Sequence, residues 1–245
     1  MSDRYFSETP IQGDQARLIG PEAHHLIHVM RAAAGTRVVL FDGSGAEFEA
    51  EVRRAGRNDV ELAVLARAEV DRELSLDVTL GVTLPKGDRQ KWLVEKAVEL
   101  GVRRLVPMHT TRSVAQPGPQ MVARLRRAVI EASKQCGRNR LMEIAPAQDW
   151  AGWMAAGQGA ALRLVAHPGG RAAGPEGPAG DWPPGSPPAG TVMLAVGPEG
   201  GFTPEEVKLA AGAGWQPVDL GPRILRVETA AIYLVAMVVA RAGSG

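Results

Sequence analysis

Polar and apolar residues alternate along the first third of the chain. Residues 47–52 alternate at every position and residues 59–62 do the same, continuing less strictly to 64, which is typical of strands buried on one face only. An apolar run at 36–41 leads into Asp42-Gly43-Ser44-Gly45, a turn of residues that tolerate positive φ. The pattern predicts a small antiparallel barrel that carries one short helix over 24–31.

The pattern changes near residue 72, where longer apolar runs and helical periodicity begin. The nearly continuous apolar runs, typical of strands covered on both faces, are 74–84, 105–107, 162–166 and 191–196. Helices are predicted over 88–100, with Asp88 as the cap, and over 122–135; Gly101 and Gly137 follow them as stop signals. Strands that alternate with helices predict an α/β domain with a largely parallel sheet. We therefore expect a β-barrel domain over 1–72 and an α/β domain over 73–245.

Composition narrows the class of protein. The 245 residues carry a formal net charge of +1, so nucleic-acid binding would need local basic clusters rather than a global field. The single cysteine, Cys136, excludes an internal disulfide and fits a reducing compartment. The N-terminus lacks the apolar core of a signal peptide, and the longest apolar run, 230–240, is too short to span a bilayer. We expect a cytoplasmic protein that is not in a membrane, with a mobile loop over the Pro/Gly-rich segment 168–190.

A glycine-rich turn at 197–201 follows the last long apolar run. Thr203, Pro204 and Glu206 then form the pattern of a capping box with proline at the first helical position. Glycines let the backbone approach a ligand closely, but a tight strand-to-helix turn explains the segment equally well. The same letters at 174–177 have no strand before them and no capped helix after them, so we give that copy no weight.

Charged residues gather in two further segments. Arg223, Arg226 and Glu228 lie between an apolar run at 218–220 and a helix that is apolar almost all round. They either bind a ligand or pair with one another at the helix start. Basic residues at 125–140 suit either a phosphate-contacting face or a solvated helix face. The five histidines have no metal-ligand spacing, so no metal is expected, and motifs for ATP, NAD or serine hydrolase chemistry are missing from the sequence.

Taken in order, several segments resemble the bacterial ribosomal RNA methyltransferases of the SPOUT superfamily, which methylate N3 of a uridine in small-subunit (16S) RNA. The segments that carry the resemblance are 25–31, 41–43, 86–87, 95–101, 135–138, 197–201 and 220–229. The resemblance implies a PUA-like β-barrel in front of a knotted α/β domain, with S-adenosyl-L-methionine (SAM) as the cofactor. It also implies ribosomal RNA of the small subunit as the partner and a homodimer formed through the knotted domain.

The resemblance also carries site residues over to this chain. The implied cofactor site comprises Val165, Ala166, His167, Val196, Gly197, Gly201, Leu220, Ile224, Leu225, Arg226, Glu228 and Thr229. The candidate catalytic residues are Arg226, to stabilise an anionic base, and Glu199 or Glu228, to assist proton removal. The candidate RNA contacts are Arg4, His25, Arg31, Arg112, Arg124, Lys134, Arg138 and Arg223.

The implied reaction is physically coherent. Uridine N3 carries a proton and is a poor nucleophile until that proton leaves, so a base or strong anion stabilisation is needed. N3 lies on the pairing edge, so the target must be unpaired or flipped out. Two alternatives stay open: a SPOUT methyltransferase that acts on a ribose 2′-OH or on tRNA, and a non-catalytic RNA-binding assembly factor. A nucleotide-binding metabolic enzyme ranks last because no phosphate motif is present.

Overall fold

The computed structural model describes residues 3–113, 118–172 and 190–242. The chain divides into two compact units, each of which is described by itself. The first comprises Met1–Glu73 and Ile130–Leu141, and the second comprises Leu74–Val129 and Met142–Gly245.

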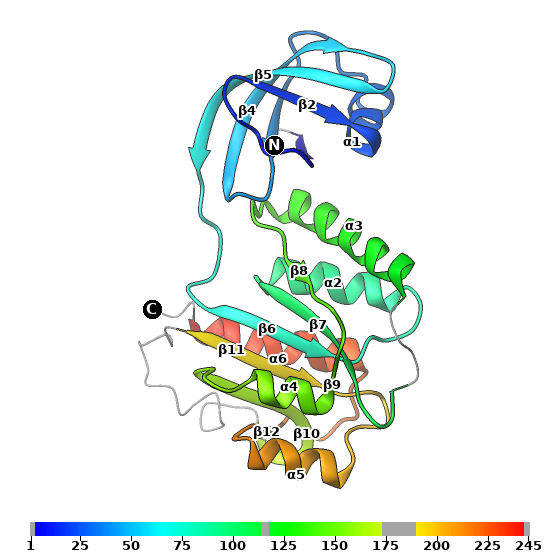
Figure 1. Ribbon diagram of the computed structural model, residues 1–245, viewed down its shortest axis with the longest axis vertical. Coiled ribbons are helices and arrows are strands. Elements are labelled where there is room, and N and C mark those ends of the chain that lie inside the picture. Colours follow the sequence, from blue (N-terminus) through cyan, green and yellow to red (C-terminus); the bar gives the residue numbers. More distant parts are fainter. Residues whose placement is uncertain (1–2, 114–117, 173–189, 243–245) are drawn as a thin grey trace. The chain divides into compact units, whose positions relative to one another are not determined.

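The first unit is built on a curled five-stranded sheet (Figure 1). Its strands are β1 (Arg4–Phe6), β2 (Gln15–Ile19), β3 (Arg37–Phe41), β4 (Ala46–Ala55) and β5 (Asp59–Glu69), in the order β1-β3-β4-β5-β2. Apart from the parallel β1–β3 pair, neighbouring strands are antiparallel. Side chains of β4 alternate between buried and exposed along most of the strand, which confirms the alternation predicted from sequence. The inward side chains, among them Tyr5, Leu40 and Phe48, form the core.

The short helix of this unit differs from its prediction. It begins earlier, as α1 (Gly20–His24), and continues as a π-helical turn, η1 (His25–Val29). Arg31 follows with φ of 54°, a left-handed conformation that few non-glycine residues adopt. The α-helical and π-helical parts have only five residues each, too few for the sequence pattern to distinguish them.

The second unit is an α/β fold with a parallel sheet. Its strands are β6 (Asp77–Val82), β7 (Arg104–His109), β8 (Glu143–Ile144), β9 (Gln148–Asp149), β10 (Leu162–Ala172), β11 (Thr191–Val196) and β12 (Gln216–Asp219). The order is β12-β10-β11-β6-β7-β8, with β9 pairing to β7, and every pair is parallel. The predicted α/β class is confirmed.

Helices cover both faces of this sheet (Figure 1). They are α2 (Arg89–Glu99), α3 (Pro119–Cys136), α4 (Trp150–Ala156), α5 (Pro204–Gly212) and α6 (Val227–Ala242); α3 from Ile130 onward belongs to the first unit. Helices α2 and α6 pack together on one face, and α4 and α5 lie on the other, where Trp153 and Trp215 fill the core. Strands β6 and β11 are buried at nearly every position, as their continuous apolar runs predict.

Three details correct or limit the predictions for this unit. Asp88 precedes α2 in helical conformation and its side chain makes no capping hydrogen bond, so the predicted cap is wrong although the helix is present. Strand β10 runs on to Ala172, so residues 168–172 of the predicted loop over 168–190 are strand instead; residues 173–189 lie outside the described residues. The predicted stops hold, because Gly101 and Gly137 follow their helices with φ of 81° and 85°.

Candidate active site

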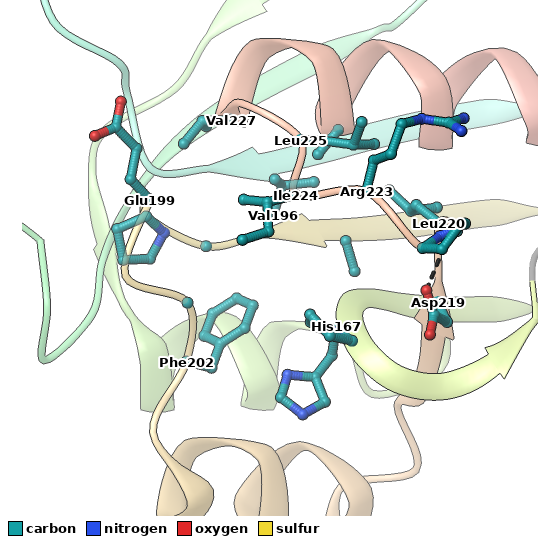
Figure 2. A pocket seen from close by; sticks show the side chains of 18 residues that line it. His167, Val196, Glu199, Phe202, Asp219, Leu220, Arg223, Ile224, Leu225 and Val227 are labelled. Carbon is teal, nitrogen blue, oxygen red and sulfur yellow. Dashed lines mark hydrogen bonds between the residues drawn. The ribbon is translucent and has the colours of Figure 1, made fainter.

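A cavity of about 300 Å³ lies beside residues 166–168 of β10 and at the ends of β11 and β12 (Figure 2). Carboxyl ends of parallel strands meet at one edge of a sheet, and this edge is where α/β proteins place ligands. The cavity is lined by Ala166, His167, Pro168, Val196, Gly197, Pro198, Glu199, Gly201, Phe202, Asp219, Leu220, Gly221, Pro222, Arg223, Ile224, Leu225, Val227 and Ala230. Its walls therefore come from β10, from the segments that follow β11 and β12, and from the start of α6.

The glycine-rich turn after β11 forms one wall. A Cβ on Gly197 would lie 2.9 Å from the Phe202 ring, so a larger residue would push that ring out of place. Phe202 is held from behind by Trp150, whose ring centroid lies 4.3 Å from its own. The predicted capping box at Thr203 and Glu206 is present. The turn is thus fixed both by aromatic packing and by a helix cap.

Asp219 fixes the loop on the opposite side. Its carboxylate accepts hydrogen bonds from the backbone N–H of Gly221 at 2.9 Å and of Gly169 at 3.1 Å. These two bonds, that of Gly221 first, lower the pKa of Asp219 below its ordinary value. Strand β10 at Gly169 and the turn after β12 are therefore tied together by the Asp219 carboxylate.

The cavity suits a ligand with both apolar and polar parts. Ile224 is 100% exposed beside it, an unusual position for a large apolar side chain. Nδ1 of His167, in contrast, is buried and has no hydrogen-bond partner among the described residues. Figure 2 shows Phe202 and His167 on one side of the space and Ile224, Leu225 and Val227 on the other. A flat base with polar edges, such as the adenosine part of SAM, fits this combination.

The structure brings most of the predicted cofactor residues together. Eight of them line the cavity: Ala166, His167, Val196, Gly197, Gly201, Leu220, Ile224 and Leu225. Val165 is buried in the core behind them. Arg226, Glu228 and Thr229 line a second hollow beside the start of α2 instead. Phe202 and Asp219 were not predicted, although the aromatic after the glycine turn and the aspartate at the strand end were visible signals.

The predicted carboxylates Glu199 and Glu228 share one cation. Nη1 of Arg89 donates to Glu199 Oε1 at 3.0 Å and lies 3.6 Å from Glu228 Oε1. The hydrogen bond to Glu199 is the main reason why the pKa of Arg89 is raised. Arg89 was missed in the sequence because only its neighbour Asp88 was interpreted, and then as a helix cap.

The predicted RNA contacts fall into two groups. In the first unit Arg4 pairs with Glu47 at 2.9 Å, Lys134 pairs with Glu22 at 3.0 Å, and Arg138 is only 4% exposed and pairs with Glu73. His25 is half-buried and packs against Tyr5, whereas Arg31 is exposed.

In the second unit the predicted contacts are more exposed. Arg112 donates to the carbonyl of Gly200 in the glycine turn, and Arg124 donates to Gln90 Oε1 at 2.9 Å. Arg223 is exposed at the mouth of the cavity.

Two absences concern only the described ranges. Within 3–113, 118–172 and 190–242, His, Cys, Asp and Glu side chains form no group of three or more that is placed to hold a metal ion. No helix in the same ranges is both long and apolar enough to cross a membrane.

Family models match most of the chain. Residues 72–239 match an RNA methyltransferase domain, and residues 18–65 match an RNA methyltransferase PUA domain. The first match covers the parallel-sheet unit through most of α6, and the second falls within the curled five-stranded sheet.

Individual relatives agree with the family models. The ribosomal RNA small subunit methyltransferase E of Mycobacterium bovis is 32% identical over 93% of this chain and 87% of its own. The structure of the same enzyme from Neisseria gonorrhoeae, bound to S-adenosyl methionine, is 28% identical, covers 96% of both chains and has a TM-score of 0.83. A chain from Legionella pneumophila solved with bound SAM is 30% identical, covers 98% of both chains and has a TM-score of 0.88. The predicted fold class, a SPOUT-type α/β domain preceded by a PUA-like barrel, is confirmed.

Proposed function

Since the chain belongs to the family of RNA methyltransferases with a PUA domain, we propose that it transfers a methyl group from SAM to N3 of a uridine in small-subunit ribosomal RNA. The observation that carries the proposal is the cavity beside β10 and at the ends of β11 and β12. Its apolar groups, and a polar group without a partner among the described residues, suit the cofactor held by the solved relatives. The name of the Neisseria gonorrhoeae and Mycobacterium bovis relatives, ribosomal RNA small subunit methyltransferase E, supports ribosomal RNA as the substrate. The uridine N3 position rests on the sequence resemblance.

The residues of the cavity would hold the cofactor from three sides. Ile224 and Leu225 offer apolar surface to the base, and the unpartnered His167 Nδ1 offers a polar contact. The backbone of Gly197 and Gly201 is open to close approach by the ligand. When bound, SAM supplies a sulfonium methyl that is already electrophilic, so the chain's own task is positioning and the management of one proton.

Arg226 is assigned to the developing negative charge on the base. A fixed guanidinium beside a nucleophile that loses its proton stabilises the anion, and such electrostatic stabilisation is often the largest contribution to catalysis. Arg226 lines the hollow next to the cofactor cavity, as do Glu228 and Thr229. This placement assigns the three residues to the substrate rather than to the cofactor.

The two segments of the chain take different parts in this function. Residues 1–72 are assigned to RNA binding and residues 73–245 to methyl transfer. The exposed arginines, Arg31 and Arg223 among them, are the proposed phosphate contacts. The enzyme is further assigned to a cytoplasmic homodimer formed through α6, where Tyr233 is exposed although the helix is largely apolar.

One experiment tests the reaction, the substrate and the target atom together. The protein is incubated with SAM and with small ribosomal subunits that lack its modification, and the RNA nucleosides are analysed by mass spectrometry. We expect a new N3-methyluridine peak. Cofactor binding by calorimetry without this peak would move the target to another RNA position, such as a 2′-OH. If SAM does not bind, a non-catalytic RNA-binding factor takes the place of the enzyme.

A further inference from the structure

A second hollow, of about 400 Å³, adjoins the cofactor cavity. Its lining comes from the start of α2, with Asp88, Arg89 and Trp92, and from the start of α6, with Arg226, Glu228 and Thr229. Successive residues of the segment that leads into α6 divide between the two spaces. Leu225 and Val227 line the cofactor cavity, whereas Arg226 and Glu228 line the hollow. The two spaces are thus neighbours across a single stretch of chain.

Glu228 has an incomplete set of partners in this hollow. It is only 6% exposed, and its Oε1 lies 3.6 Å from Nη1 of Arg89. Its Oε2 is buried and accepts no hydrogen bond from any residue that the structure describes. A buried carboxylate oxygen without a donor costs free energy, so its place in the hollow calls for an explanation. The hollow therefore lacks a hydrogen-bond donor at this point.

The two carboxylates beside Arg89, Glu199 and Glu228, differ in burial and in hydrogen bonding. Glu199 has a side chain that is 67% exposed, and it already accepts a hydrogen bond from Arg89 at 3.0 Å. Glu228 is the buried one, and the same guanidinium faces its other oxygen. Arg89 can therefore orient Glu228 through its Oε1 while Oε2 keeps no donor among the described residues.

The polar groups of the hollow match one pyrimidine edge. The pairing edge of uracil presents a carbonyl, the N3–H donor and a second carbonyl. The hollow is lined by Arg89 and Arg226, whose guanidinium groups are donors, and by Glu228, whose buried Oε2 has no donor among the described residues. Cytosine would turn the N3 lone pair toward this carboxylate, which is repulsive. Trp92, 41% exposed, supplies an aromatic face on which an unstacked base can lie.

We infer that this hollow receives the reacting uracil, that Oε2 of Glu228 accepts its N3 proton, and that Arg89 is the positioning residue for Glu228. The inference rests on the proposed function. N3 loses its proton to Glu228, and its electron pair forms the new bond to the methyl carbon. The carbon–sulfur bond breaks with its electron pair leaving on sulfur, and the carboxyl group then releases the proton to solvent. The reaction needs no oxidant, reductant or further co-reactant.

The test measures transfer of a labelled methyl group from SAM to small-subunit RNA, with the nucleoside product identified separately. Glu228→Gln keeps the shape of the side chain but cannot accept the proton as a carboxylate. We expect its kcat to fall by about 100-fold or more while the Kd for SAM, measured by calorimetry, stays unchanged. Arg89→Met should lower kcat by about 10-fold, and Arg89→Lys should restore part of the loss. Trp92→Ala should raise KM for the subunit, and Trp92→Phe should not.

The dependence on pH separates proton removal from a structural role. The charged groups that face Glu228 are Arg89 and Asp88 on α2, Arg226 on its own segment and Glu199, through Arg89. In Glu228→Gln the uracil must ionise without help, so its rate should climb from about pH 7 to about pH 9 more steeply than that of the unsubstituted enzyme. A merely structural defect would not be rescued by alkali.

Matched controls come from an exposed ion pair between Arg104, at the start of β7, and Glu143, in β8. Glu143→Gln and Arg104→Met remove a pair of the same type, joined at 2.8 Å, and both variants should methylate normally. Full activity in Glu228→Gln, or a loss that pH does not rescue, would overturn the inference. If the labelled product is not N3-methyluridine, the assignment of the hollow to uracil fails. The ratio of kcat between Glu228→Gln and the unsubstituted enzyme then still tests whether Glu228 takes part in the reaction. If the unsubstituted enzyme transfers no methyl group, the proposed function fails and the inference fails with it.

Discussion

The basic residues of the two units differ in whether an acidic side chain pairs with them. In the barrel unit Arg4, Lys134 and Arg138 are largely buried, and each pairs with a glutamate of the same unit. In the parallel-sheet unit Arg223 and Arg226 are exposed beside the two hollows, and neither forms an ion pair within the described ranges. Clustering of basic residues in the sequence is the same signal in both regions. Only the structure separates cations that stabilise a fold from cations that are available to a ligand.

The distance along the chain explains why the sequence could not make this distinction. Lys134 and its partner Glu22 are 112 residues apart, and Arg138 and Glu73 are 65 apart. Lys134 also lies 5.5 Å from the centre of the Tyr5 ring, where burial raises the pKa of the Tyr5 hydroxyl to about 12. These partners meet only after folding, so no local pattern announces them.

The largest effect should come from breaking a buried pair in the barrel unit. Arg138→Met leaves Glu73 without its main cation in a poorly solvated place, so we expect a loss of about 3 kcal/mol in the free energy of unfolding. Urea denaturation measures this loss. Methyl transfer per folded molecule should change little at low temperature. An unchanged stability with weaker RNA binding would instead place Arg138 among the RNA contacts.

At Arg226 we expect the opposite, a loss of activity with little change in stability. Arg226→Ala should lower kcat by about 100-fold, since a donor aimed at developing charge is lost, while the melting temperature stays within about 1 °C. Arg103→Ala, which removes an exposed arginine paired with Asp77, is the control for a general effect of charge loss. A fall in melting temperature in proportion to activity would make Arg226 structural, and the contrast between the two units would disappear.

The fold was more predictable than the site, and for a physical reason. Alternation in β4 and continuous burial in β11 are properties of the local sequence, so both strands were predicted, β11 with its observed bounds and β4 without its first residue and its last three. The glycine turn and its capping box are also local, and they mark the cavity correctly.

No local sequence pattern predicts the second hollow. It depends on Arg89 at the start of α2 facing Glu228 at the start of α6, two helices that are far apart in the sequence and packed together in the fold. Short elements were missed for a related reason. Strand β1 has only three residues, and α4 has seven, too few for either to show a clear period.

A third prediction uses acid to probe the paired charges of the barrel unit. Burial by itself would raise the pKa of Glu47, but hydrogen bonds from Arg72 and Arg4 outweigh it and lower the pKa below its ordinary value. A carboxyl group whose pKa is lower in the folded state stabilises the fold above its unfolded pKa of about 4.3 and loses that contribution as pH falls toward the folded pKa. Glu47→Gln should therefore reduce stability at pH 7 and flatten its decline below about pH 4. Urea midpoints across this range measure both, and parallel curves for the two proteins would contradict the prediction.

The smallest expected effect is on the salt dependence of RNA binding. It compares an arginine that forms no ion pair within the described ranges with an arginine that forms one. Arg223→Ala should weaken RNA binding only a few-fold but reduce the slope of log Kd against log salt concentration by about one, because one phosphate contact is lost. Arg37→Ala is the matched variant in the barrel unit: Arg37 is similarly exposed, but it pairs with Glu49 at 3.4 Å, so its removal should leave the slope unchanged. Filter binding of small-subunit RNA at several salt concentrations measures both slopes. If both variants reduce the slope equally, a surface ion pair does not prevent an arginine from binding RNA. Only the position of an arginine would then indicate whether it contacts RNA. A reduced slope for Arg223→Ala alone would extend the distinction between the units from the buried pairs to the surface.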